Sequence, residues 1–137
     1  CNYFIMQYTS LAALRLKAKM LEKMELHFDA KLALHLVTQD DMKSSGAMQK
    51  DCEDALEESL CLTTVNVALL LKENKDGTIK GSLRTDGVVD ASLIALSFSG
   101  GGHHSRAGFT LSSEFTLESG SKELLKILEK EITLGKK

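Results

Sequence analysis

Residues 99–109 concentrate the side chains and backbone that could bind a ligand. Gly100, Gly101 and Gly102 are consecutive, and His103 follows them directly. A run of glycine costs conformational entropy, so it needs a structural or functional reason. Successive unobstructed N–H groups can form a concavity that binds an anion. From the residues alone, an anion-binding loop and a plain loop remain equally good interpretations.

Two arginines are candidates to share such a site. Arg106 lies inside the segment, and Arg84 ends an alternating stretch, residues 78–85. The planar guanidinium group matches the geometry of phosphate and can donate two parallel hydrogen bonds to it. Alternation places Arg84 with Lys80 and Ser82 on the polar face of a strand. An ordinary surface arginine is the alternative at both positions.

The histidines do not predict a metal site. Adjacent side chains such as His103 and His104 point apart on most backbones, and no nearby cysteine or carboxylate completes a ligand set. Ser105 lacks the context of a nucleophile elbow, and the cysteines have no evident base. His35 lies in an apolar run and is interpreted as a packed residue. We therefore predict no metal ligand and no catalytic residue in this chain.

Hydrophobic periodicity predicts the elements that position these residues. Leu11, Leu14, Ala18 and Leu21 form the expected apolar stripe of a first helix. The acidic residues 50–58 predict a helix with a solvated face, without the spacing of a calcium loop. Ser10, Asp40, Asp90 and Ser121 are expected N-caps, and Leu93 is expected to face inward. Predicted helices cover residues 11–24, 50–58, 91–97 and a segment from 121, with strands at 32–38, 64–73, 78–85 and 108–111.

This order predicts an α/β fold, a mixed β-sheet of about four to five strands flanked by helices. A strand followed by a helical segment and a second strand favours a parallel pair. The turn at residues 74–77 contains Asp-Gly and predicts an antiparallel hairpin.

Composition limits the possible function classes. The chain has 137 residues, with 43% hydrophobic and 26% charged residues, which fits one globular domain. A net charge of −2 gives no global basic field for nucleic acid. Three cysteines without a CxxC pair favour reduced thiols and a cytoplasmic location, and no apolar run suits a membrane span. The first residue is Cys rather than Met, which predicts a piece of a longer protein.

Several motifs together resemble a known family. In chain order they are Ser82-Leu83-Arg84-Thr85-Asp86-Gly87, Asp90-Ala91-Ser92, Gly100-Gly101-Gly102-His103 and Ala107-Gly108-Phe109. They resemble the C-terminal, DHH-associated domain of the DHH phosphoesterase family. Within that family they are similar to the bifunctional oligoribonuclease and phosphoadenosine-phosphate phosphatase branch. The resemblance covers about residues 11–131.

The resemblance implies a division of labour between two domains. Residues 25–137 would be the substrate-binding domain, and residues 1–24 an N-terminal segment with the helix that connects it to a missing DHH domain. The missing domain would hold manganese or magnesium and perform the hydrolysis. Because the Asp-His-His signature is absent here, this chain alone is expected to be inactive and to need no cofactor of its own.

The resemblance also implies a substrate site. Arg84, Gly100, Gly101, Gly102 and His103 would contact the phosphate or terminal nucleotide of short single-stranded RNA or DNA, or of 3′-phosphorylated nucleotides. Arg106 departs from the family pattern, which usually has alanine there, and would add a phosphate contact or alter substrate choice. The alternative function is a non-catalytic module that binds single-stranded nucleic acid or another protein.

Overall fold

Two apolar runs form the centre of a β-sheet. They are the strands β2, Leu32–Val37, and β3, Val67–Glu73, which pair in parallel with Leu32 opposite Val67. Both strands are buried along most of their length because helices cover both faces of the sheet, which explains their continuous apolar sequence. The predicted parallel pair is confirmed.

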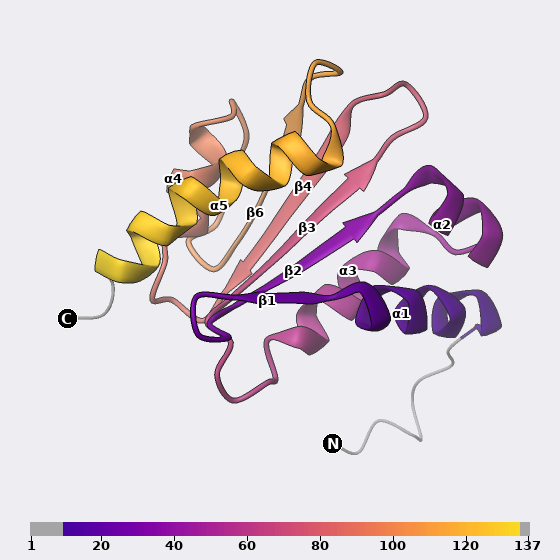
Figure 1. The fold of residues 1–137 in the computed structure, drawn as a ribbon, viewed down its shortest axis with the longest axis horizontal. Coiled ribbons are helices and arrows are strands. Elements are labelled where there is room, and N and C mark those ends of the chain that lie inside the picture. The colour runs from indigo at the N-terminus through magenta and orange to yellow at the C-terminus, as the bar shows by residue number, and fades with distance from the viewer. Residues whose placement is uncertain (1–9, 135–137) are drawn as a thin grey trace.

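The computed structural model describes residues 10–134 (Figure 1). Its six strands have the order β1-β2-β3-β4-β6-β5. All pairs other than β2–β3 are antiparallel. The remaining strands are β1 (Glu25–His27), β4 (Ile79–Thr85), β5 (Gly101–Gly102) and β6 (Arg106–Leu111). The α/β fold with a mixed sheet is confirmed, but the expected four to five strands are too few. The edge strands β1 and β5 have only three and two residues, which is too short for a periodic pattern.

Helices cover the two faces of the sheet in separate groups (Figure 1). On one face, helices α4 and α5 contribute to a core with the strands, through residues such as Ile94 and Leu124. On the other face, α1 and α3 bury Leu16, Met20 and Leu56 against β2 and β3. The helices are α1 (Leu11–Lys23), α2 (Gln39–Ser45), α3 (Gln49–Ser59), α4 (Ala91–Leu96) and α5 (Leu117–Leu134). No helix in the described part of the chain is long and apolar enough to cross a membrane.

The buried face of α1 differs from the prediction. The helix buries Leu16 and Met20, whereas Leu11, Leu14 and Leu21 are exposed. Both stripes have helical spacing, so periodicity alone could not show which of them meets the sheet. The expected cap at Ser10 is confirmed by the hydrogen bond from the Ala13 N–H.

Three smaller expectations about helix ends and faces are wrong. Helix α2 is capped by Thr38 rather than Asp40, because Thr38 and Asp41 form a reciprocal capping box. Helix α5 begins at Leu117, before Ser121, and the Thr116 hydroxyl accepts a hydrogen bond from an N–H in its first turn. On α4, Leu93 is exposed while Ile94 faces the core. The predicted cap at Asp90 is confirmed.

Candidate functional site

Arg84 lies near the end of β4 and is buried beneath α3. Strand alternation points its side chain away from the core that contains Leu83, toward the face covered by α3. The guanidinium group donates from Nη2 to Glu53 Oε1 at 2.9 Å and from Nε to Glu57 Oε1 at 3.2 Å. Its Nη1 donates to the Leu83 carbonyl at 3.0 Å. Only 7% of the side chain is exposed, so the interpretation as a surface arginine is wrong.

Arg106 is the cross-strand partner of Arg84. It is the first residue of β6, directly opposite Arg84 in the antiparallel register. Its Nη2 lies 3.0 Å from the same Glu57 Oε1 that Arg84 contacts. The two guanidinium groups, placed side by side by the register, therefore share one carboxylate oxygen. The side chain of Arg106 is 60% exposed, so solvent reaches this pair from the Arg106 side.

The acidic residues that hold the arginines were not identified from the sequence. Glu53 and Glu57 are one turn apart on α3, so they project from the same side of that helix. The sequence predicted only a solvated acidic face. The available signal was the i, i+4 spacing of two acids on a helix whose Cys52 and Leu56 are buried. That signal does not say which strand the acids meet.

The glycine segment forms an edge hairpin with β6. Gly101 pairs with Gly108, and Gly102 pairs with Ala107. A Cβ on Gly100 would lie 2.2 Å from the Gly108 carbonyl oxygen, and one on Gly102 would lie 2.6 Å from the Ala107 Cα. These two glycines are required by contacts within the chain itself. Gly101 is exposed, and a Cβ on it would meet nothing within 4 Å, so its glycine is not required by a contact within the chain.

His103 and His104 form the turn of this hairpin. The His103 N–H donates to the Arg106 carbonyl at 2.7 Å, and the His103 Nδ1 lies 3.1 Å from the Ser105 hydroxyl. The ring centroids of the two histidines are 4.1 Å apart, and both side chains are exposed. The adjacent rings therefore do not point apart as expected. The structure brings His103 next to Arg106 in a surface turn.

Hydrogen bonds attach the turn to the end of β4 and the start of α4. The Thr85 N–H donates to the Ser105 carbonyl at 2.8 Å, and the Ala91 N–H donates to the His104 carbonyl at 2.7 Å. At the same corner, the hydrogen bond from the Ser92 hydroxyl lowers the pKa of Asp90, which keeps this cap ionised. The predicted residues from β4 and from the glycine segment thus lie at one corner of the sheet.

The sheet face beside Arg106 is open. Along β6, Ala107, Phe109 and Leu111 point into the core and are buried, while Arg106 and Thr110 on the opposite face are exposed. The core formed by α1 and α3 includes residues of β2 and β3 and none of β6. A ligand can therefore approach the two arginines along this uncovered edge of the sheet.

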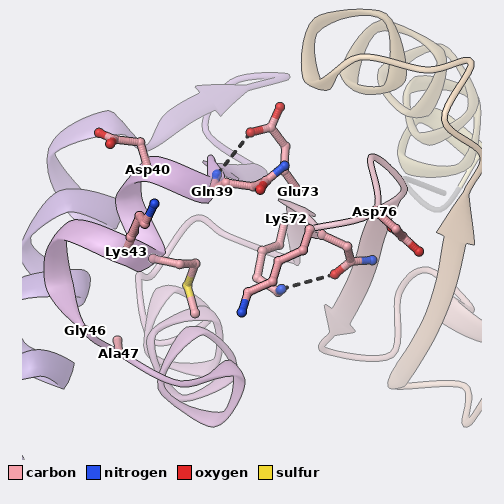
Figure 2. Close-up of a pocket in the computed structure, with 11 residues that line it drawn as sticks. Gln39, Asp40, Lys43, Gly46, Ala47, Lys72, Glu73 and Asp76 are labelled. Carbon is pink, nitrogen blue, oxygen red and sulfur yellow. Dashed lines mark hydrogen bonds between the residues drawn. The ribbon is translucent and has the colours of Figure 1, made fainter.

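An open pocket elsewhere in the chain contains none of the predicted site residues (Figure 2). It lies where β3 ends and α2 begins, at the opposite end of the sheet from Arg84. Some of its polar groups are paired: the Gln39 N–H donates to Glu73 at 3.0 Å, and Lys72 donates to Asn74 at 3.2 Å. Lysines and acids both line it, so it shows no preference for a charged ligand.

The described residues do not form a metal site. Within residues 10–134, no group of three or more His, Cys, Asp or Glu side chains could hold a metal ion. His103 and His104 have no carboxylate or thiol beside them that completes such a set. The chemistry that this corner can perform is the binding of an anion by guanidinium groups and backbone N–H groups.

Comparison with known proteins gives one family match and several structural matches. A model of the DHHA1 domain matches residues 30–133. An exopolyphosphatase-related protein from Bacteroides fragilis has a TM-score of 0.85 and 27% identity, over 98% of this chain and 39% of that one. A pGpG-specific phosphodiesterase from Vibrio cholerae has a TM-score of 0.60 and 13% identity, over 90% of this chain and 40% of that one. The chain thus spans about two fifths of each of these structures. No curated protein matches the sequence.

Proposed function

The chain belongs to the DHHA1 domain family, and on this premise we propose that it is the substrate-binding domain of a DHH-family phosphoesterase. The proposed substrates are short oligonucleotides and 3′-phosphoadenosine 5′-phosphate. The proposed catalytic partner is a DHH domain of the same protein, which would hold the manganese or magnesium ions. Because the residues described here form no metal ligand set, we assign them to binding and not to the hydrolytic step.

One observation carries the proposal: two guanidinium groups and a ligand-accessible hairpin converge at one corner of the sheet. Arg84 is buried, and a buried ion pair is often no more stable than apolar residues of similar volume. Stability alone therefore gives little reason for an arginine at this position. Binding of phosphate gives a direct reason, since the guanidinium fork matches phosphate oxygens.

Each site residue has a distinct proposed role. Arg84 and Arg106 would donate to phosphate oxygens, and His103 would donate to the same group from the hairpin turn. The open backbone of Gly101 would allow close approach of the ligand. Gly100 and Gly102 would act indirectly, by permitting the close contact of β5 with β6.

The comparisons support phosphate chemistry more than a particular substrate. The Vibrio protein is a pGpG-specific phosphodiesterase, but its 13% identity to this chain indicates a shared fold alone. The Bacteroides protein is described as related to an exopolyphosphatase. The two arginines and the sequence motifs therefore support nucleotide ligands.

Titration of the 137-residue chain with pGpG and with 3′-phosphoadenosine 5′-phosphate tests the proposal. Arg84→Ala is expected to weaken binding of both by about tenfold or more, because a hydrogen bond to a charged group contributes about 1.5–3 kcal/mol. Arg15→Ala, which removes an exposed arginine of α1, is the matched control and should change nothing. Equal affinities of Arg84→Ala and the wild type would refute the proposed site.

Comparison of Arg84→Ala with Arg84→Lys separates an effect on binding from an effect on folding. Arg84→Ala leaves Glu53 and Glu57 without Arg84, but both acids are partly exposed and can be rehydrated. We expect a loss of about 1–2 kcal/mol in unfolding free energy. Arg84→Lys keeps the charge and loses the fork, so it should fold normally and still bind weakly. Tight binding of long single strands without terminal phosphates, unaffected by either variant, would favour the non-catalytic alternative.

A further inference from the structure

Glu57 occupies the position between two guanidinium groups. Its Oε1 accepts from Arg84 Nε at 3.2 Å and from Arg106 Nη2 at 3.0 Å. The two arginines face each other across adjacent antiparallel strands, where like charges repel. A negatively charged oxygen between them offsets that repulsion. The Glu57 carboxylate thus stands where one oxygen of an anionic ligand would bind.

The contacts of Glu57 are easily replaced. Its side chain is 52% exposed, and that of Arg106 is 60% exposed, so their ion pair is surrounded by water. Exposed ion pairs contribute little to stability, so Glu57 loses its contact with Arg106 at small cost. Its contact with the buried Arg84 is the one that an incoming phosphate oxygen would replace. Glu53 differs, because it contacts Arg84 through a separate nitrogen, Nη2, at 2.9 Å. Arg84 would therefore keep one acidic partner after Glu57 leaves.

We propose that Glu57 is an intramolecular competitor at a phosphate subsite formed by Arg84 and Arg106, and that this subsite selects a terminal phosphomonoester. The inference rests on the proposed function and deepens it. A terminal phosphate carries about −1.5 to −2 charge at neutral pH and three free oxygens. An internal phosphodiester has one charge and two free oxygens. Two guanidinium groups that no longer share the Glu57 carboxylate therefore interact more strongly with a terminal phosphate than with an internal phosphodiester.

Arg106 is the specificity-determining residue in this arrangement. Arg84 alone already has Glu53 to neutralise it, so it offers one partly compensated charge to a ligand. Arg106 has no other ion-pair partner than Glu57 in the described part of the chain. Displacement of Glu57 leaves Arg106 uncompensated at the open edge of the sheet, and this charge is available to a terminal phosphate.

The experiment compares pApA with unphosphorylated ApA by calorimetric titration of the 137-residue chain. Glu57→Gln keeps the shape of the side chain and removes the competing charge. It is expected to tighten pApA binding by about two- to fivefold, the range open to an exposed ion pair, and to leave ApA binding unchanged. Arg106→Ala should weaken pApA binding and remove most of the gain from Glu57→Gln in the double variant.

Glu58→Gln is the matched control. Glu58 is the next residue on α3 and pairs with Lys17 at 2.7 Å, so its substitution makes the same change in net charge without touching either arginine. An equal gain in Glu58→Gln, an equal gain for ApA, or no gain in Glu57→Gln would each overturn the inference. If Arg84→Ala still weakens nucleotide binding in that case, the proposed function stands without it. If the wild-type chain binds neither nucleotide, both fail.

Discussion

His35 and Arg84 are both buried, but only Arg84 has partners for its polar atoms. The imidazole of His35 lies on β2 and is fully buried, and neither ring nitrogen has a hydrogen-bond partner among the described residues. Burial lowers the pKa of His35, and the nearby backbone of Met20 offsets only part of that effect. Arg84 remains charged because Glu53 and Glu57 compensate it. His35 is therefore neutral in the folded chain at neutral pH.

The buried imidazole predicts a pH-dependent stability. A histidine of an unfolded chain titrates near about 6.5, so the unfolded state takes up a proton below that pH while folded His35 does not. Protonation thus favours unfolding, and stability should fall as the pH decreases from about 6.5 toward the lowered pKa of the folded state. The expected slope approaches about 1.4 kcal/mol per pH unit. Urea unfolding between pH 5 and 8 measures it.

Substitutions of two histidines identify which residue causes the pH dependence of the unfolding free energy. His35→Leu should remove it, and it should be neutral or stabilising at pH 7 because it eliminates two unsatisfied buried nitrogens. His104→Gln, in an exposed turn, should keep the slope. The lowered pKa values of Asp41 and Asp90 stabilise the folded state, and this stabilisation is lost only as the pH falls below the ordinary carboxylate range, outside this window. A slope that persists in His35→Leu would contradict the assignment.

At the level of elements, the edge strand β5 explains why glycines occur together. Gly100 and Gly102 lie against the backbone of β6 so closely that a side chain on either would clash. Gly102 also has a φ of 148°, which side chains rarely adopt. Gly101, between them, has neither constraint. The glycine run therefore combines one structural requirement at its ends with an accessible backbone at its centre.

Alanine substitutions separate these two requirements. Gly100→Ala is expected to destabilise the chain by about 2–3 kcal/mol, because the new Cβ would overlap a backbone oxygen. Gly101→Ala should change stability by less than about 0.5 kcal/mol. If a ligand approaches this backbone, Gly101→Ala should nevertheless weaken nucleotide binding. Thermal melting and titration of both variants check this pair of outcomes, and equal destabilisation by the two substitutions would be inconsistent with the hairpin geometry.

For the whole molecule, the uneven cover of the sheet determines where a ligand can bind. One face is closed by α4 and α5, while the helices on the other face leave β6 uncovered. The two arginines lie at the border between the covered and the open part, so Arg84 is buried and Arg106 is exposed. At this border, the buried guanidinium group of Arg84 therefore lies beside the solvent-accessible guanidinium group of Arg106.

The same architecture predicts binding without hydrolysis. No set of three metal-ligating side chains is assembled in residues 10–134. The 137-residue chain, incubated with pGpG and manganese, is therefore expected to release no mononucleotide above background in a chromatographic assay. A commercial phosphodiesterase serves as the positive control. Manganese-dependent product formation that EDTA abolishes would contradict the division of labour between the two proposed domains.

The sequence by itself determined the elements with strong local patterns. The apolar runs of β2 and β3 and the Asp-Gly hairpin between β3 and β4 were predictable, because burial on both faces and turn chemistry leave direct traces in the sequence. The motifs around Arg84 and His103 were sufficient to indicate the family, and the DHHA1 match confirms that level of the assignment. The finer assignment to a nucleotide-degrading branch stays a prediction.

The tertiary structure alone decided how these residues are used. Glu57 is 27 residues from Arg84 in the chain, so no local period could show that they share a hydrogen bond. The same limit applies to α1, whose two apolar stripes are equivalent until the helix meets the sheet and buries Leu16. It applies also to Gly100, whose need for glycine comes from the β6 backbone. Contacts between distant segments depend on the packing of whole elements, and that packing places Glu57 between the two arginines.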